Sequence, residues 1–149
     1  MGYSPLFRGS SFKVPARALA TSYQSGSISD IVAGTPVSSN GAGMISPLDV
    51  SSQSSIAGFV GLANALIPSS ATGLVTTNGR VEALTLTGFS LGDPVYVGKN
   101  GTLTNSLPDY GVAGFAAGDF IMFIGVVVKN EFDSSLKDIQ LMAELIGQL

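Results

Sequence analysis

The chain has 149 residues, of which 45% are hydrophobic and only 11% are charged, and its formal net charge at pH 7 is −3. It contains no Cys and no His, which excludes disulfide bonds, thiolate chemistry and the side chain that most often acts as general base or metal ligand. Its longest apolar run is strand-length, well short of the roughly 18 residues of a membrane span. Because a typical soluble domain is about 25% charged, the low charge indicates apolar surface covered by other subunits.

The seven Lys and Arg residues stand singly along the chain. Nucleic-acid binding relies on clustered basic side chains that neutralise phosphates. We therefore expect neither a nucleic acid nor a membrane as a partner.

Residues 1–27 are predicted to form an extended N-terminal arm ahead of a β-barrel domain over residues 28–149. Pro5 and Pro15 interrupt any regular element, and no helical or strand period persists. A disordered terminus is the alternative, but aromatic residues favour an arm that docks, because solvated tails are usually poor in them. The candidate contacts of the arm with a partner are aromatic and arginine side chains, namely Tyr3, Phe7, Arg8, Phe12 and Arg17.

The first part of the barrel domain is predicted as short strands separated by loops of small residues. Residues 28–33 and 44–45 are predicted strands, and residues 38–43 form a turn-rich loop. Residues 55–67 are predicted as a buried strand that is broken by glycines. An apolar helix is the alternative for this segment, although two glycines each cost a helix about 1 kcal/mol relative to Ala.

Asn78-Gly79 predicts a tight β-hairpin, because a type I′ turn requires positive φ at both central positions. The flanking segments, residues 73–77 and 80–87, are apolar enough for strands. We expect these two strands to pair with each other.

A second hairpin is predicted over residues 92–104. Asp93-Pro94 sets up an extended entry, since a residue before proline is pushed out of the helical region. Asn100-Gly101 supplies the two-residue turn between short strands over residues 95–97 and 102–104.

Residues 105–119 are predicted as a long loop, and a loop of this length in a compact domain is often functional or a contact surface. Asp109, Tyr110 and Phe115 are its candidate contact residues. The two aromatic rings, if exposed, would stack on a sugar. The aspartates have a simpler role open to them, since aspartate in turns bonds the local backbone.

The last third of the chain contains the strongest predicted strand, residues 120–128, which we expect to be central. Its Phe-Ile-Gly-Val-Val segment resembles the Phe-Val-Gly-Leu-Ala segment at residues 59–63, which indicates either a weak internal repeat or a chance match. Residues 134–149 fit a helical face slightly better than a strand by periodicity, and both remain open on the residues alone.

No catalytic, cofactor or metal site is predicted. Ser is abundant, but without His a serine triad cannot form, and the lysines stand in contexts typical of exposed turns, the arm or strand ends, which gives a Ser–Lys dyad little support. Asp109 and Asp119 could supply oxygen ligands to calcium, but no calcium-binding sequence pattern accompanies them.

The most specific motif reads Gly-Asp-Pro-Val-Tyr-Val-Gly-x-Asn-Gly-x-Leu-Thr over residues 92–104, followed by Ile-Gly-Val-Val over residues 124–127. Over residues 55–130 the chain with these motifs resembles the head decoration, or capsid cement, proteins of tailed phages, whose related modules recur in tail fibres. The resemblance implies an all-β barrel or sandwich that is commonly packed as trimers on the capsid surface. It also implies that the chain closes on a strand.

The resemblance therefore implies a structural virion protein without enzymatic activity, made in the cytoplasm of a bacterial host. Its partners would be the major capsid protein, on the outer surface of the shell, and two further copies of itself in a homotrimer. Two alternatives stay open. One is a tail-fibre or baseplate component, and the other is a glycan- or receptor-binding module that uses the 105–119 loop.

Overall fold

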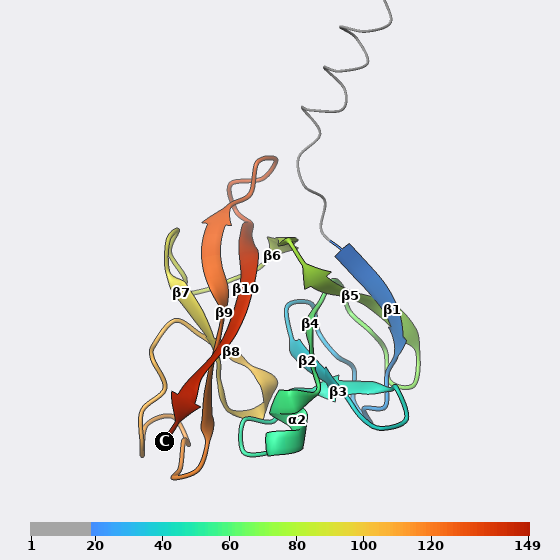
Figure 1. Cartoon of the computed structure of the whole chain (residues 1–149). Helices are drawn as coiled ribbons and strands as arrows, with labels where there is room; N and C mark the ends of the chain where they lie inside the picture. Colours follow the sequence, from blue (N-terminus) through green and yellow to red (C-terminus); the bar gives the residue numbers. More distant parts are fainter. Residues whose placement is uncertain (1–18) are drawn as a thin grey trace, which may run out of the picture.

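The structure, a computed structural model, describes residues 19–149. Its fold is all-β, as predicted: two curled antiparallel sheets of five strands each lie side by side and form a half-barrel (Figure 1). No helix in the described part of the chain is long and apolar enough to cross a membrane.

The first sheet has the strand order β1-β5-β4-β2-β3. A short helix, α2 (Gln53–Ala57), lies between β3 and β4, and it begins where the Ser52 hydroxyl accepts a hydrogen bond from the Ser55 amide at 3.2 Å. The strands of this sheet are β1 (Leu19–Gln24), β2 (Pro36–Ser39), β3 (Ile45–Pro47), β4 (Phe59–Ala63) and β5 (Thr72–Asn78).

The second sheet has the strand order β6-β10-β9-β7-β8, so β9 is central, as predicted. The C-terminal segment is a strand, as the resemblance implied, and not the helix that periodicity slightly favoured. It pairs with β9 over most of its length, which decides the conformation. The strands of this sheet are β6 (Arg80–Leu84), β7 (Pro94–Val97), β8 (Leu103–Thr104), β9 (Phe120–Lys129) and β10 (Lys137–Gln148).

Each sheet covers a hydrophobic core of its own. The first core is formed by Ile31, Val37, Ile45, Ala63, Ile67 and Val75. The second core is larger and is built on β6, β7, β9 and β10, but it also takes in three residues from the first sheet and its loop, namely Leu48, Val50 and Leu62.

The two sheets have the same topology. Each strand of the first sheet has a counterpart five strands later in the chain, at the same place in the second sheet. The described chain is therefore two consecutive units, a first unit (residues 19–78) and a second unit (residues 80–148).

The strand registers repeat as well. In the first unit Val37 pairs with Gly61, and the next pair skips one residue of β4. In the second unit Val95 pairs with Gly125, and the next pair skips one residue of β9. Both central strands therefore carry a β-bulge at the same position, and the weak repeat predicted from residues 59–63 is confirmed as a repeat of structure.

The entry to the second strand of each unit is also the same. It reads Gly-Thr-Pro-Val at residues 34–37 and Gly-Asp-Pro-Val at residues 92–95. The amide of Gly34 donates to the Ala63 carbonyl at 2.8 Å, and the amide of Gly92 donates to the Val127 carbonyl at 2.8 Å. The sequence motif and the hydrogen bonds at its first glycine are thus the same where β2 and β7 begin.

The prediction of a hairpin at Asn78-Gly79 is wrong. Gly79 does have the positive φ that the pair predicts, 88°, but the strands on either side of it lie in different sheets. The Gly79 carbonyl accepts a hydrogen bond from the Leu141 amide at 2.8 Å, and Val81 pairs with Ile139. The apolar face of β6 is thus buried against β10, so the turn becomes the crossover between the units.

The hairpin predicted at Asn100-Gly101 is confirmed, with φ values of 61° and 73°. Its loop has three residues (η1, Lys99–Gly101) rather than the two expected, because the Gly98 amide donates to the Thr102 carbonyl at 2.7 Å. The extended entry at Asp93-Pro94 is also confirmed, since β7 begins at Pro94.

Two other segments differ from the prediction. Residues 28–33 do not form a strand, and only Ile31 makes an isolated bridge, with Ile67. Residues 55–67 are not one strand, because the last turn of α2 and Gly58 precede β4.

The predicted arm over residues 1–27 is wrong for the part that the structure describes, and residues 1–18 lie outside the described residues. Residues 19–24, which we assigned to it, form β1 and pair with β5 along its length. A strand here was missed because its side chains are nearly all exposed, so no alternation of apolar and polar residues marks it.

Gly61 and Gly125 are the positions at which the repeat depends most on the absence of a side chain. A Cβ atom at Gly61 would overlap the carbonyl oxygen of Thr76, and one at Gly125 would overlap that of Gln140. We expect Gly61→Ala and Gly125→Ala each to lower the free energy of unfolding by about 1–3 kcal/mol, because the neighbouring strand must move away. Chemical denaturation measures this.

Gly147→Ala is the matched control, because it lies in β10 and a Cβ atom there would meet no described atom within 4 Å. If Gly61→Ala and Gly125→Ala were as stable as this control, the close approach of the strands at these two glycines would be contradicted.

Candidate functional site

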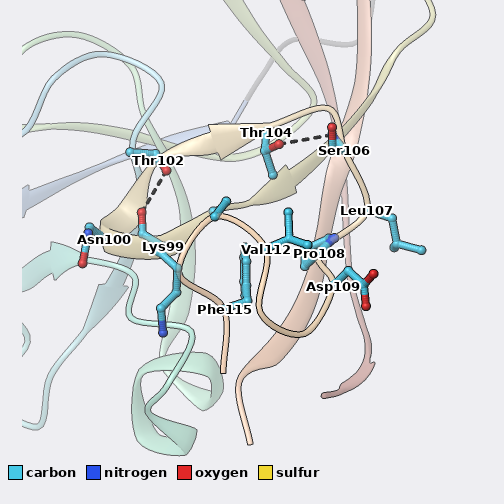
Figure 2. Close-up of a pocket in the computed structure, with 12 residues that line it drawn as sticks. Lys99, Asn100, Thr102, Thr104, Ser106, Leu107, Pro108, Asp109, Val112 and Phe115 are labelled. Carbon is cyan, nitrogen blue, oxygen red and sulfur yellow. Dashed lines mark hydrogen bonds between the residues drawn. The ribbon is translucent and has the colours of Figure 1, made fainter. Parts of the chain in front are cut away.

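The long loop over residues 105–119 packs against the β7–β8 hairpin, and the two enclose a pocket of about 200 Å³ (Figure 2). The loop lies where it was predicted, since β8 ends at Thr104 and β9 begins at Phe120. The pocket is lined by Gly98, Lys99, Asn100, Thr102, Thr104, Ser106, Leu107, Pro108, Asp109, Val112, Ala113 and Phe115.

A partly buried ion pair joins the two walls of this pocket. The Nζ atom of Lys99, on the hairpin, is 2.6 Å from Oδ2 of Asp119, at the end of the loop. The same oxygen accepts a hydrogen bond from the Ala116 amide at 2.8 Å, and the ring of Phe115 lies 5.9 Å from the ammonium. The hydrogen bond from Lys99, and then that from Ala116, hold the pKa of Asp119 below its usual value.

The base of the loop is hydrogen-bonded to the C-terminal residue and to the first unit. The Gly118 amide donates to the Leu149 carbonyl at 2.6 Å, and the Leu149 amide donates to the Asp119 carbonyl at 2.8 Å. The next residue, Phe120, donates from its amide to the Val50 carbonyl at 2.8 Å. The C-terminus, the loop and the first unit thus meet at Asp119.

The three loop residues proposed as contacts do not form one surface. Asp109 lines the pocket and is exposed, whereas Tyr110 is exposed but does not line it. Phe115 is buried in the second core, so its proposed role as a sugar-stacking ring is wrong. The loop folds back over the hairpin, and this buries the ring that sequence reasoning placed at its surface.

The Asp119 carboxylate is already paired, because its Oδ2 atom accepts hydrogen bonds from Lys99 and from the Ala116 amide. Over residues 19–149 there is no group of three acidic, His or Cys side chains that could hold a metal. The side chain of Lys99 contacts Asp119, and no serine side chain of the described chain is hydrogen-bonded to it.

The remaining predicted turn residues act on the local backbone. The carboxylate of Asp93 accepts hydrogen bonds from the Ser90 amide at 2.8 Å and from the Asn105 side chain at 2.9 Å. The bond from Ser90, and then that from Asn105, hold its pKa below the usual value. The five arm residues proposed as partner contacts, Tyr3, Phe7, Arg8, Phe12 and Arg17, lie outside the described residues.

A second, wider groove of about 500 Å³ lies between the two units. On one side it is lined by residues 30–35 and Pro47 of the first unit. On the other it is lined by residues 85–87, Phe89 and residues 100–103 of the second unit. Its walls are mostly threonine and apolar side chains, and Asp30 is the one ionisable residue among the residues that line it.

A set of apolar side chains stands in solvent, and of these only Tyr110 was named as a contact residue from the sequence. They occupy loops and the strands β1, β5 and β10, where no periodic pattern separates an exposed residue from a core residue. Those of the described chain are Leu19, Ile28, Val32, Leu66, Leu74, Leu91, Leu107, Tyr110, Val112, Phe132, Met142, Leu145 and Ile146.

Comparison of the chain with protein-family models, with curated proteins and with solved structures finds no match.

The Lys99–Asp119 pair yields a prediction on stability and pH. Because the pKa of Asp119 is lowered on folding, the pair stabilises the fold fully above the ordinary value of 3.8, and this stability is lost as the pH falls below it. Asp119→Asn should lower the free energy of unfolding at pH 7 by about 1–3 kcal/mol. The loss should shrink towards pH 3, as measured by denaturant unfolding at several pH values.

Asp109→Asn serves as the control, because it removes an exposed carboxylate from the same loop. Equal losses at pH 7 and pH 3 for Asp119→Asn would contradict the ion pair as the source of the stability.

Proposed function

We propose that this protein is a structural component of a tailed-phage virion that binds the outer surface of the capsid and stabilises the shell. The observation that carries the proposal is that the residues of the resemblance form one physical unit. Residues 92–104 form the β7–β8 hairpin with its entry, and residues 124–127 lie in β9, which pairs directly with β7. The motif is therefore a packing unit of the fold and not a scattered set of turns.

The surface of the fold supports an assembly role. The chain is poor in charge, and large apolar side chains stand exposed on both units. A soluble protein gains by covering such side chains, and interfaces are where they are usually covered. In the proposed virion, the cover is the major capsid protein together with neighbouring copies of the chain in a homotrimer.

Stabilisation would follow from mass action. A protein that binds only the assembled shell lowers the free energy of that state relative to free capsid subunits. Single contacts need not be strong, because a trimer engages several sites at once and the second and third contacts become intramolecular. The protein would be made in the bacterial cytoplasm and would reside on the capsid surface.

The N-terminal segment is the proposed anchor. Residues 1–18 contain Tyr3, Phe7 and Phe12 together with Arg8 and Arg17, and aromatic and arginine side chains dominate interface energetics. This segment contains no acidic residue, whereas the remainder of the chain contains all ten. The anchor would therefore favour an acidic or apolar surface.

Removal of residues 2–18 tests the anchor. The cut must stop before residue 19, because a longer deletion would remove β1 from the first sheet. The shortened protein should keep its free energy of unfolding and lose attachment to capsid shells in co-sedimentation. The double variant Phe7→Ala, Arg8→Ala in the full chain should weaken attachment in the same direction.

Saturable binding of the full chain to bare heads at a fixed copy ratio is the expected result. Co-sedimentation with tails instead of heads would replace the proposal with the tail-fibre alternative. Attachment of the shortened protein as strong as that of the full chain would remove the anchor role.

A further inference from the structure

The contact between the two units is made by different surfaces on each. On the first unit, a plug segment (residues 47–50, which begins at the last residue of β3) packs against the second unit. Leu48 and Val50 on this plug are 1% and 0% exposed and belong to the second core. On the second unit, the β7–β8 hairpin receives it: a Cβ atom at Gly101 would lie 2.8 Å from Cβ of Pro47.

The internal repeat shows that this contact is head to tail. Gly43 is the counterpart of Gly101, with φ values of 79° and 73°, but a Cβ atom at Gly43 would meet no atom of residues 19–149 within 4 Å. Gly34 faces the Leu84 side chain at 3.4 Å, whereas its counterpart Gly92 faces nothing in that part of the chain. A twofold contact would cover both members of each pair, and here only one is covered.

In a head-to-tail contact, the surface of the second unit that corresponds to the plug stays uncovered. The surface of the first unit that corresponds to the receiving hairpin also stays uncovered. On the second unit, the counterpart of the plug is the segment after β8. Its apolar side chains are Leu107, Tyr110 and Val112, which are 60%, 67% and 56% exposed. Figure 2 shows Leu107 pointing away from the hairpin. By the strand register, Leu48 and Val50 correspond to Ser106, which is exposed, and Pro108, which is buried. The exposed apolar side chains of the second unit thus lie in the same segment as the plug counterpart, at neighbouring positions.

The unused receiving surface lies on the first unit. It consists of the β2–β3 hairpin loop (residues 40–44) and residues 27–29, which precede β2 and correspond to residues 85–87 in the wall of the groove. This segment contains Ile28, which is 97% exposed. The loop itself carries no charge, so burying it involves no desolvation of an ion.

We propose that copies of this chain associate head to tail, with the 105–113 segment of one copy packed against Ile28 and the 40–44 loop of the next. The occupant is a second copy, because the chain already makes a contact of this kind between its own halves. Heterologous contacts close into a ring when the rotation between copies closes, and a ring of three copies would hold six units. The inference rests on the self-association within the proposed function, and it is independent of attachment to a capsid.

Three variants of the full chain test this by light scattering on a sizing column, without capsid present. Leu107→Glu combined with Val112→Glu removes the plug counterpart, and Ile28→Glu removes the receiving surface. Phe132→Glu is the matched control, because Phe132 is 94% exposed on the β9–β10 loop, away from both surfaces. Unchanged unfolding free energies establish that all three fold.

The wild type and the control should be oligomers of the same size, and the other two variants should be monomers. A mixture of these two monomers should form a heterodimer and nothing larger, because each retains the one surface that the other lacks. A monomeric wild type, variants that keep the oligomer, or a mixture that stays monomeric would overturn the inference. Failure of capsid attachment would not affect any of these readings.

Discussion

The fold depends on two places where the backbone of one strand takes the space of a side chain on its neighbour. Gly61 in β4 and Gly125 in β9 let the carbonyl groups of β5 and β10 approach closely, and a bulge lies next to each glycine. Bulges increase local twist and bend a strand. Each sheet therefore curls, and the curl lets five short strands cover a core that a flat sheet of this size would leave open to water.

The shared curl explains why the chain has two cores. The contact between the two units is nevertheless asymmetric. Each unit covers its own apolar residues, but Leu48 and Val50 of the first unit complete the second core. The two halves are thus joined by a contact that is not symmetric. A molecule built in this way has two different unfilled ends, and such ends suit repeated addition of the same chain better than binding of a small molecule.

The 105–119 loop links this architecture to the proposed role at a capsid. The partly buried Lys99–Asp119 pair and the hydrogen bonds to the C-terminal residue hold the base of the loop, and a backbone hydrogen bond joins Gly111 to Phe115 in its outer part. Rigid presentation lowers the entropy lost on binding. A charge-poor, rigid surface repeated over many copies is what a shell-stabilising protein requires, since each copy adds little and the lattice multiplies it.

The sequence by itself determined the local elements: the hairpin at Asn100-Gly101, the strand over residues 120–128, the loop before it and the absence of thiol or imidazole chemistry. These follow from backbone preferences and hydrophobic pattern, which act over a few residues. The tertiary structure alone decided that Asn78-Gly79 is a crossover, that residues 19–24 join a sheet and that Phe115 is buried. It also decided that the C-terminus is a strand. Each of these depends on which distant segment pairs with the residues or packs over them. The pattern of neighbouring residues in the sequence does not identify that segment.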